Sequence, residues 1–217
     1  MKHPLFNAAV VFALTCAVIA AEPPRKFTVL ALANPRAVAV DGADNLYVGD
    51  VDGGTVHQIT PAGEATLLGG GQSIKDPIGL AVDRAGNVFV ADADDNAVFK
   101  ISTSGSVVSI GSPVAGEPGF ATPTSVAVDA AGNVFVTDNG GASIRRVAPD
   151  GKLSTFAGKK DARGNADGAP GDARFGSPRG IAIDAKGNLY VADTGNAAIR
   201  QIAPDGTVTT IAAATKP

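Results

Sequence analysis

Eight aspartates are the residues whose type and spacing could do chemistry. They form four pairs, and the members of each pair lie nine residues apart: Asp41 and Asp50, Asp83 and Asp92, Asp129 and Asp138, Asp184 and Asp193. Paired carboxylates can serve as general acid and base or hold a metal ion. A single active site needs only one such pair, however, and Asp side chains also accept hydrogen bonds from backbone N–H groups in turns. We therefore predict that these carboxylates cap turns.

Glycines at a fixed offset support the turn interpretation. Gly86, Gly132 and Gly187 each lie three residues after the first aspartate of a pair. A glycine at the fourth position of a turn tolerates positive φ at no steric cost. In the first copy Asp44 takes the place of this glycine, so we expect that turn to differ slightly.

His57 is the only histidine beyond residue 21, and no cysteine follows Cys16. A catalytic zinc site needs about three protein ligands, commonly histidines, so zinc is not expected. No Gly-x-Ser-x-Gly motif offers His57 a nucleophile. In the other copies its place is taken by Phe99, Arg145 and Arg200. Because this column is polar or aromatic, we predict that His57 is a solvent-facing strand residue.

Calcium at a loop or channel is the only cofactor that the sequence leaves open. The stretch Asp92–Asn96 has the oxygen density that calcium prefers, but an EF-hand loop has glycine at its sixth position and glutamate at its twelfth. Ala97 and Thr103 stand at those positions. We predict a solvated turn and no bound metal.

The paired aspartates belong to a pattern that is written four times without a gap. Each copy opens on a proline and runs to a glycine 28 residues later. In the fourth copy, short apolar or alternating runs at Gly180–Asp184, Asn188–Ala192, Ala198–Ile202 and Thr207–Ala212 are separated by turn residues. Such runs are typical of strands. Each copy is therefore predicted to be a meander of four antiparallel strands, with the fourth strand outermost.

One such sheet cannot bury both of its faces in water, but stacking sheets around an axis does so. We therefore predict an all-β fold, a β-propeller with one four-stranded blade per copy. A β-sandwich is an alternative, and so is a solenoid, although its coils would be shorter. In a propeller, Val40, Val82, Val128 and Ile183 should occupy equivalent places near the hub.

Length varies only between the copies. Gly63 to Pro77 spans 14 residues, Gly105 to Pro123 spans 18, and Gly151 to Pro178 spans 27. Insertions on one face of a repeat array often mark its binding side. The longest insertion has a basic tendency, interleaved with aspartates. We expect it to carry a binding face made of seven residues: Lys159, Lys160, Arg163, Asp167, Arg174, Phe175 and Arg179.

The N-terminal residues 1–21 read as a cleaved signal peptide, with Lys2 ahead of the uncharged run Leu5–Ala20. The run is shorter than a membrane span needs, so an uncleaved anchor is the lesser alternative. A lipoprotein acylated at Cys16 is another. The sequence thus predicts a secreted or periplasmic protein with no membrane span after cleavage. The net charge of −3 argues against nucleic acid as a partner.

The repeated residues resemble the NHL repeat family. The resemblance rests on Pro178-x-Gly180-Ile-Ala-Ile-Asp184-x-x-Gly187-Asn-Leu-Tyr-Val-Ala-Asp193, on Ile199-Arg200-x-Ile202 and on Pro204-Asp205-Gly206, and it extends over Asn34–Ala213. The Asn-His pair that helps to name the family reads Asn196-Ala197 here. The family implies a β-propeller, usually of six blades.

Four repeats, at about 34–69, 76–111, 122–158 and 177–213, occupy the domain from residue 22 to 217. We expect a small, open or incomplete ring, with an extra strand at about 26–32. An open arc would expose apolar surface and is expected to self-associate. The first functional hypothesis is an exported scaffold that binds protein, peptide or glycan. The alternative is a metal-assisted hydrolase or lyase acting at the channel.

Overall fold

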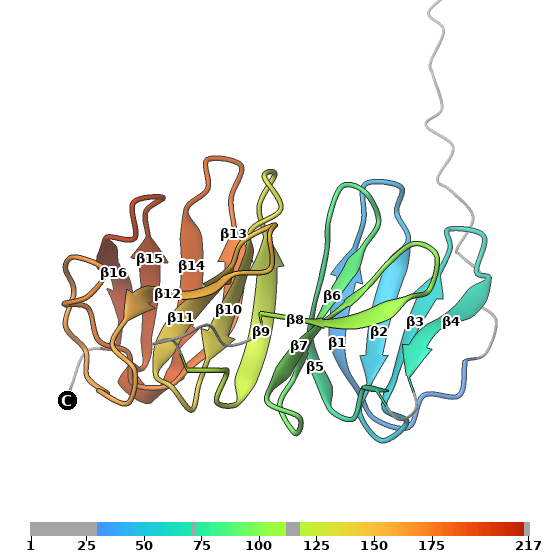
Figure 1. Cartoon of the computed structure of the whole chain (residues 1–217), viewed down its shortest axis with the longest axis horizontal. Coiled ribbons are helices and arrows are strands. Elements are labelled where there is room, and N and C mark those ends of the chain that lie inside the picture. The colour runs from blue at the N-terminus through green and yellow to red at the C-terminus, as the bar shows by residue number, and fades with distance from the viewer. Residues whose placement is uncertain (1–29, 71–72, 112–117, 215–217) are drawn as a thin grey trace, which may run out of the picture.

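Each copy of the repeat folds into its own four-stranded antiparallel sheet. The computed structural model describes residues 30–70, 73–111 and 118–214. Within every sheet the strands are hydrogen-bonded in chain order, so each sheet is a meander of three hairpins (Figure 1). The described residues contain no α-helix, and η2 (Thr194–Asn196) is a single 3-10 turn. The predicted all-β fold of four-stranded antiparallel blades is confirmed.

The first two sheets cover the first half of the chain. The first sheet consists of β1 (Pro35–Val40), β2 (Leu46–Asp50), β3 (Thr55–Ile59) and β4 (Ala65–Gly70). The second sheet consists of β5 (Pro77–Val82), β6 (Val88–Asp92), β7 (Ala97–Ile101) and β8 (Val107–Ile110).

The third and fourth sheets follow in the same order. The third sheet consists of β9 (Pro123–Val128), β10 (Val134–Asp138), β11 (Ser143–Val147) and β12 (Leu153–Gly158). The fourth sheet consists of β13 (Pro178–Ile183), β14 (Leu189–Asp193), β15 (Ala198–Ile202) and β16 (Val208–Ala213). The four strands predicted for this last copy agree with the observed ones to within two residues at either end.

The sheets stack face to face in chain order, and each contact is a separate hydrophobic cluster. One cluster joins the first and second sheets around Val56 and Val90, the next joins the second and third around Val98 and Val136, and the last joins the third and fourth around Ile144. The inner strands β1, β5, β9 and β13 lie side by side in this order. Stacking therefore removes from water the apolar faces that a lone sheet would expose.

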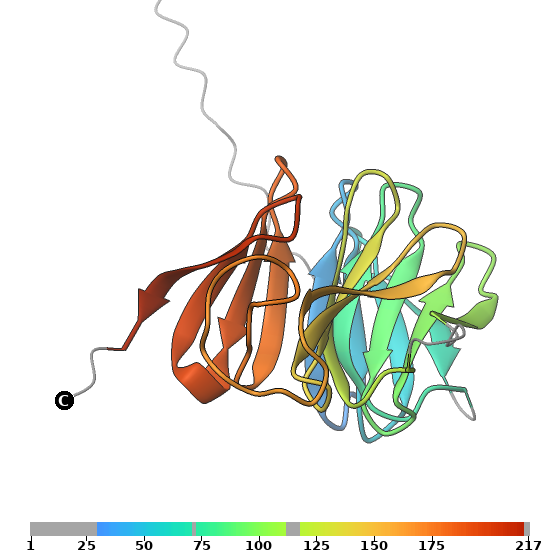
Figure 2. The ribbon, with the colours of Figure 1, turned by 60° about the vertical axis from the view of Figure 1, so that its left-hand side comes forward.

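The array is an open arc. In the part of the chain that the structure describes, β13 and β1 share no packing of the kind that joins β1 to β5. Figure 2 shows the fourth sheet at one end of the arc, with no sheet beyond it. Val82, Val128 and Ile183 line one common hollow, so the predicted equivalence near the hub is confirmed for these residues. Val40 ends β1 in the same way but is 59% exposed at the other end of the arc.

The outer edge of the fourth sheet is covered by the crossover that precedes it. Gly168 pairs with Val208 of β16 through two backbone hydrogen bonds, of 2.9 and 3.1 Å. The Asp167 carboxylate also accepts the N–H of Thr210 at 2.9 Å. Covering an edge strand in this way blocks edge-to-edge pairing with another chain.

Of the additional N-terminal strand predicted at 26–32, residues 26–29 lie outside the described residues. Leu30–Leu32 are described and are not part of a strand. The predicted signal peptide also lies outside the described residues. No helix in the described ranges combines the length and the hydropathy of a membrane span.

The turn of the first copy keeps the hydrogen bond of the other turns and differs only slightly, in the φ of its fourth residue. Asp44 adopts φ 63°, in the left-handed region where Gly86, Gly132 and Gly187 have φ 83°, 85° and 84°. Its N–H donates to the carbonyl of Asp41 at 3.1 Å, as the N–H of Gly187 does to Asp184 at 3.0 Å. Asp is among the few residues that tolerate this conformation, so the same turn forms without glycine.

The turn geometry yields a stability prediction. Gly187→Val should lower the free energy of unfolding by about 1–3 kcal/mol, because a β-branched residue is strained at positive φ. The matched control is Gly42→Val, in the equivalent turn of the first copy. Gly42 lies outside the left-handed region, and a Cβ added there would meet no atom within 4 Å. Chemical denaturation should separate the two variants, and equal midpoints would contradict the turn assignment.

Candidate functional site

The first aspartate of each pair lies in the turn between the inner strand and the second strand. The Asp184 carboxylate accepts the N–H groups of Lys186 and Asn188 at 2.8 and 2.9 Å, the Asn188 amide at 2.8 Å and the Tyr190 hydroxyl at 3.2 Å. The Asn188 amide contributes most to holding the pKa of Asp184 below its ordinary value. The backbone and asparagine bonds recur at Asp41, Asp83 and Asp129.

The second aspartate of each pair is buried and holds the start of the inner strand. Asp193 Oδ1 accepts the N–H groups of Gly176 and Ser177, both at 2.9 Å, just ahead of Pro178. Asp50 accepts the N–H groups of Ala33 and Asn34, which hold its pKa below the ordinary value. These carboxylates therefore fasten each crossover to the end of the second strand.

Two residues equivalent to His57, Arg145 in the third sheet and Arg200 in the fourth, have fully buried side chains. Arg200 lies 3.2 Å from the Asp193 carboxylate and 2.6 Å from that of Asp167, and its guanidinium stacks 5.1 Å from the centre of the Phe175 ring. The burial of this arginine could have been predicted from the motif Ile-Arg-x-Ile, which places arginine between two apolar positions of a strand.

Asp138 has fewer partners than the equivalent Asp193. Its Oδ1 accepts one N–H, from Ala121 at 2.7 Å. Its Oδ2 is 3.9 Å from Arg145 and has no hydrogen-bond donor among the described residues. In the fourth sheet the amide of Asn196 donates to Asp193, whereas Gly141 occupies that place in the third. Burial raises the pKa of Asp138 to about 6, against the opposing effects of Ala121 and Arg145.

Several residues of the predicted binding face hold the long crossover in place. Asp167 binds Arg200 and Thr210, Arg174 donates to the carbonyls of Gly171 and Ala173, and Arg163 donates to those of Asn139 and Gly176. Phe175 is fully buried against the third and fourth sheets, so it belongs to the core and offers no surface to a ligand.

The remaining members of the predicted face do not form one cluster. Lys159 and Lys160 line a shallow hollow of about 300 Å³ together with Phe156 and Pro170. Arg179 is exposed near the start of β13, and its carbonyl accepts the hydroxyl groups of Thr124 and Thr137 from the third sheet.

A larger hollow lies at the hub, where the sequence suggested a channel site for the alternative enzyme but assigned no residues to it. Its volume is about 470 Å³, and it is lined where β5, β9 and β13 end and their turns begin. Val82, Val128 and Ile183 contribute apolar side chains, and Arg84 and Lys186 are the only cationic residues of the lining. The turn residues Ala130, Ala131 and Ala185 complete much of its rim, with Asp83, Asp129, Asp184 and Gly187. Three sheets thus present equivalent positions to one concave surface.

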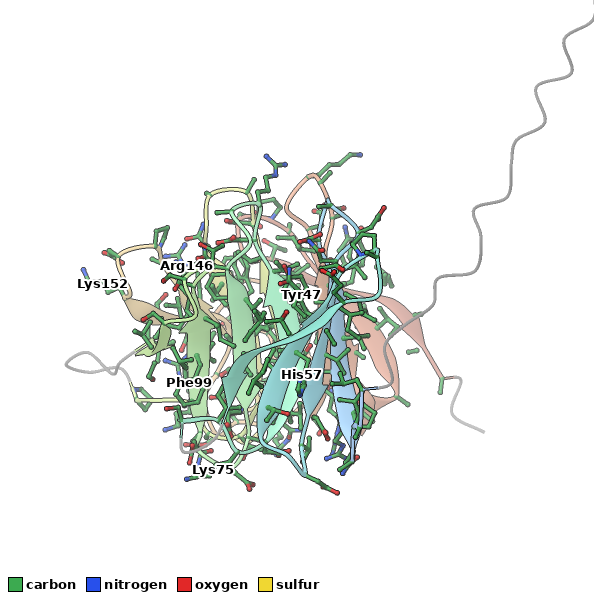
Figure 3. The ribbon with its side chains drawn as sticks, turned by 90° about the vertical axis from the view of Figure 1, so that its right-hand side faces the viewer. Tyr47, His57, Lys75, Phe99, Arg146 and Lys152 are labelled. Carbon is green, nitrogen blue, oxygen red and sulfur yellow. The ribbon has the colours of Figure 1, made fainter. Side chains whose placement is uncertain are left out.

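His57 lies on β3 of the first sheet, which faces the viewer in Figure 3. It is half-buried, and its Nε2 lies 3.0 Å from the Thr55 hydroxyl. In the loop whose oxygen density suits calcium, Asp92 is buried and accepts the N–H of Lys75, while Asp95 pairs with the Lys75 ammonium. The described residues contain no group of three or more His, Cys, Asp or Glu placed to hold a metal ion.

The raised pKa of Asp138 predicts how stability depends on pH. The folded protein holds this proton up to a pH of about 6, whereas an unfolded carboxyl loses it near 3.8. Between these values the folded state binds more protons, so the free energy of unfolding should fall as the pH rises. Asp138→Asn cannot ionise and should flatten this part of the curve, as denaturant titrations at several pH values can measure. An unchanged slope would contradict the assignment.

The buried ion pair yields a second prediction. Arg200→Met should lower the free energy of unfolding by about 3 kcal/mol or more, because it leaves Asp193 buried without its charged partner. Arg179→Met is the matched control. Since Arg179 is exposed, we expect a change within about 0.5 kcal/mol. Thermal and chemical denaturation of both variants measure the difference, and similar losses would show that burial of the pair is not the cause.

Comparison with known proteins agrees with this architecture. The NHL repeat family matches residues 175–202. No curated protein sequence matches the chain. A protein of unknown function from Bacteroides thetaiotaomicron is 26% identical, with a TM-score of 0.66 over 81% of this chain and 47% of that one.

Two further structures are similar in fold. Virginiamycin B lyase from Staphylococcus aureus is 18% identical, with a TM-score of 0.66 over 85% of this chain and 57% of the lyase. An auxiliary nutrient binding protein from Bacteroides thetaiotaomicron is also 18% identical, with a TM-score of 0.67 over 85% of this chain and 48% of that one. The chain spans about half the length of these three structures. Residues 175–202 therefore match the NHL repeat, and the chain has the fold of a β-propeller, in an open arc of sheets.

Proposed function

We propose that this protein is an exported binding scaffold whose ligand, a protein, peptide or glycan, occupies the hub hollow. The observation that carries the proposal is the hollow of about 470 Å³ to which three sheets contribute equivalent turns. Concave surfaces built by loops on a rigid framework are the usual place for ligands. Export rests on the signal-like character of residues 1–21.

The hub turns combine a fixed framework with variable residues. The framework is the Asp-x-x-Gly turn, whose carboxylate is occupied by backbone N–H groups and an asparagine amide. The two residues between differ from copy to copy: Arg84 and Ala85 in the second, two alanines in the third, and Ala185 and Lys186 in the fourth. Arg84 and Lys186 are exposed, so they supply donors that no turn requires.

The distribution of carboxylates supports binding rather than catalysis. The hub aspartates accept bonds that shape their own turns, and the buried aspartates hold the crossovers. General acid–base catalysis needs a group that can exchange a proton with the substrate, whereas the Asp184 carboxylate in the lining of the hollow already accepts four hydrogen bonds. Two of the similar structures are described as auxiliary nutrient binding proteins. Their description is consistent with a binding role on this fold.

A metal-assisted lyase or hydrolase is the second candidate, and the similarity to virginiamycin B lyase is the observation that favours it. Measurement of tightly held metal in the purified protein would distinguish the two, with His57→Ala as the companion variant. Stoichiometric metal that this substitution releases would favour the enzyme.

The test of the scaffold is a binding screen followed by paired variants. Purified protein is screened against neutral and uronic-acid oligosaccharides and short peptides, and any hit is titrated by calorimetry. The double variant Arg84→Ala with Lys186→Ala should bind at least about tenfold more weakly, a loss of about 1.4 kcal/mol. The double variant Lys159→Ala with Lys160→Ala removes the same charge from the crossover hollow and should bind as the parent does.

The opposite result, with loss only in the Lys159 and Lys160 variant, would place the ligand on the crossover and contradict the hub site. Absence of binding to every probe would contradict the scaffold for these ligand classes.

A further inference from the structure

In the part of the chain that the structure describes, no sheet packs on one apolar face of the first sheet, although Val48 at the centre of that face is only 4% exposed. Val38 of β1 is 67% exposed, whereas the equivalent residues Leu80 and Val126 are 8% and 3% exposed between sheets. Val40 and Leu67 on the same face are 59% and 58% exposed. The side chains thus have the chemistry of an internal interface, but no sheet covers them.

Among the described residues, no sheet packs on the opposite face of the fourth sheet. Ile199 of β15 is 38% exposed, whereas the equivalent Val56, Val98 and Ile144 are fully buried against the next sheet. A hollow of about 500 Å³ lies around Ile199. Its other lining residues are Thr194 and the alanines at positions 192, 197, 198 and 212–214.

Gly180 lies on this face of the fourth sheet, where equivalent small residues of other sheets contact the next inner strand. A Cβ at Gly79 would lie 2.7 Å from Ser125 of the next inner strand, and one at Gly49 would lie 2.6 Å from the carbonyl of Pro77. These small residues let inner strands approach closely. At Gly180, equivalent to Gly79, a Cβ would meet only Ala192, at 3.8 Å. The fourth sheet therefore retains the gap that a further inner strand fills elsewhere.

We propose that these two faces bind each other in a second copy of this chain. The fourth sheet of one copy packs on the first sheet of the other, and the reciprocal contact closes a ring of two copies. The exposed face of the fourth sheet is equivalent to one side of each internal interface, and the exposed face of the first sheet is equivalent to the other side. We therefore expect the two faces to be complementary. The covered edge of β16 favours contact by the face rather than by edge pairing.

Closure by two copies would place eight sheets around one axis, four from each copy. Closure would also bring the first sheet's hub turn, Asp41–Asp44, to the open side of the hub hollow. The assembly is inferred from the faces alone and does not depend on the proposed ligand.

The test is the mass of the protein in solution, measured by light scattering and sedimentation. The parent chain should be a dimer. Val38→Glu and Gly180→Glu each place a charge on one of the two faces, and each should give a monomer with an unchanged circular dichroism spectrum. Val108→Glu, at a valine that is 48% exposed on β8, and Gly171→Glu, at an open position of the crossover, are the matched controls and should remain dimers.

Mixing separates this arrangement from the alternatives. In a mixture of Val38→Glu and Gly180→Glu, the unaltered fourth sheet of the first variant meets the unaltered first sheet of the second, so a 1:1 heterodimer should form. A dimer that survives Val38→Glu, or a mixture that stays monomeric, would overturn the head-to-tail contact. A monomeric parent chain would overturn the assembly, and species larger than a dimer would overturn the closed ring.

Discussion

The structure depends on the burial of apolar sheet faces against one another, which covers both faces of the second and third sheets. A four-stranded meander carries apolar side chains on each side, and the middle of each sheet contains residues such as Val90, Val136 and Val191 that are fully buried. Such a sheet has no stable existence alone in water. Its neighbours supply the cover, so the unit of stability is the contact between sheets rather than the sheet itself.

The buried aspartate column makes this stacking compatible with crossovers of unequal length. Because Asp193 holds two backbone N–H groups just ahead of Pro178, the inner strand begins at the same place whatever the preceding segment does. The third and fourth sheets add a buried arginine, and in the fourth sheet it also reaches the crossover through Asp167. Buried charges are costly unless they are paired, so this network requires its complete set of partners.

The fold could be predicted from the sequence because its signals are local and repeated. Ungapped copies fix the strands, the turns and the antiparallel order to within two residues. The residues of the hub hollow could not be predicted in this way. The hollow is formed by three turns that lie about 50 residues apart in sequence, and no single turn indicates a site. The contacts of the charged residues in the long crossover could not be predicted for a related reason. Composition indicates charge, but only packing shows that Asp167 and Arg174 already have partners.

The proposed assembly follows from the number of contacts between the described sheets. Four sheets in a row have three internal contacts, and the two end faces keep the side chains of a fourth. Soluble monomers rarely expose large contiguous apolar faces, and these two end faces expose Val38 and Ile199. The hub hollow leads to the same conclusion, because three turns surround it and the fourth, Asp41–Asp44, lies at the far end of the arc. A ring gives every sheet two neighbours, so completing the stack and completing the hub are one structural event.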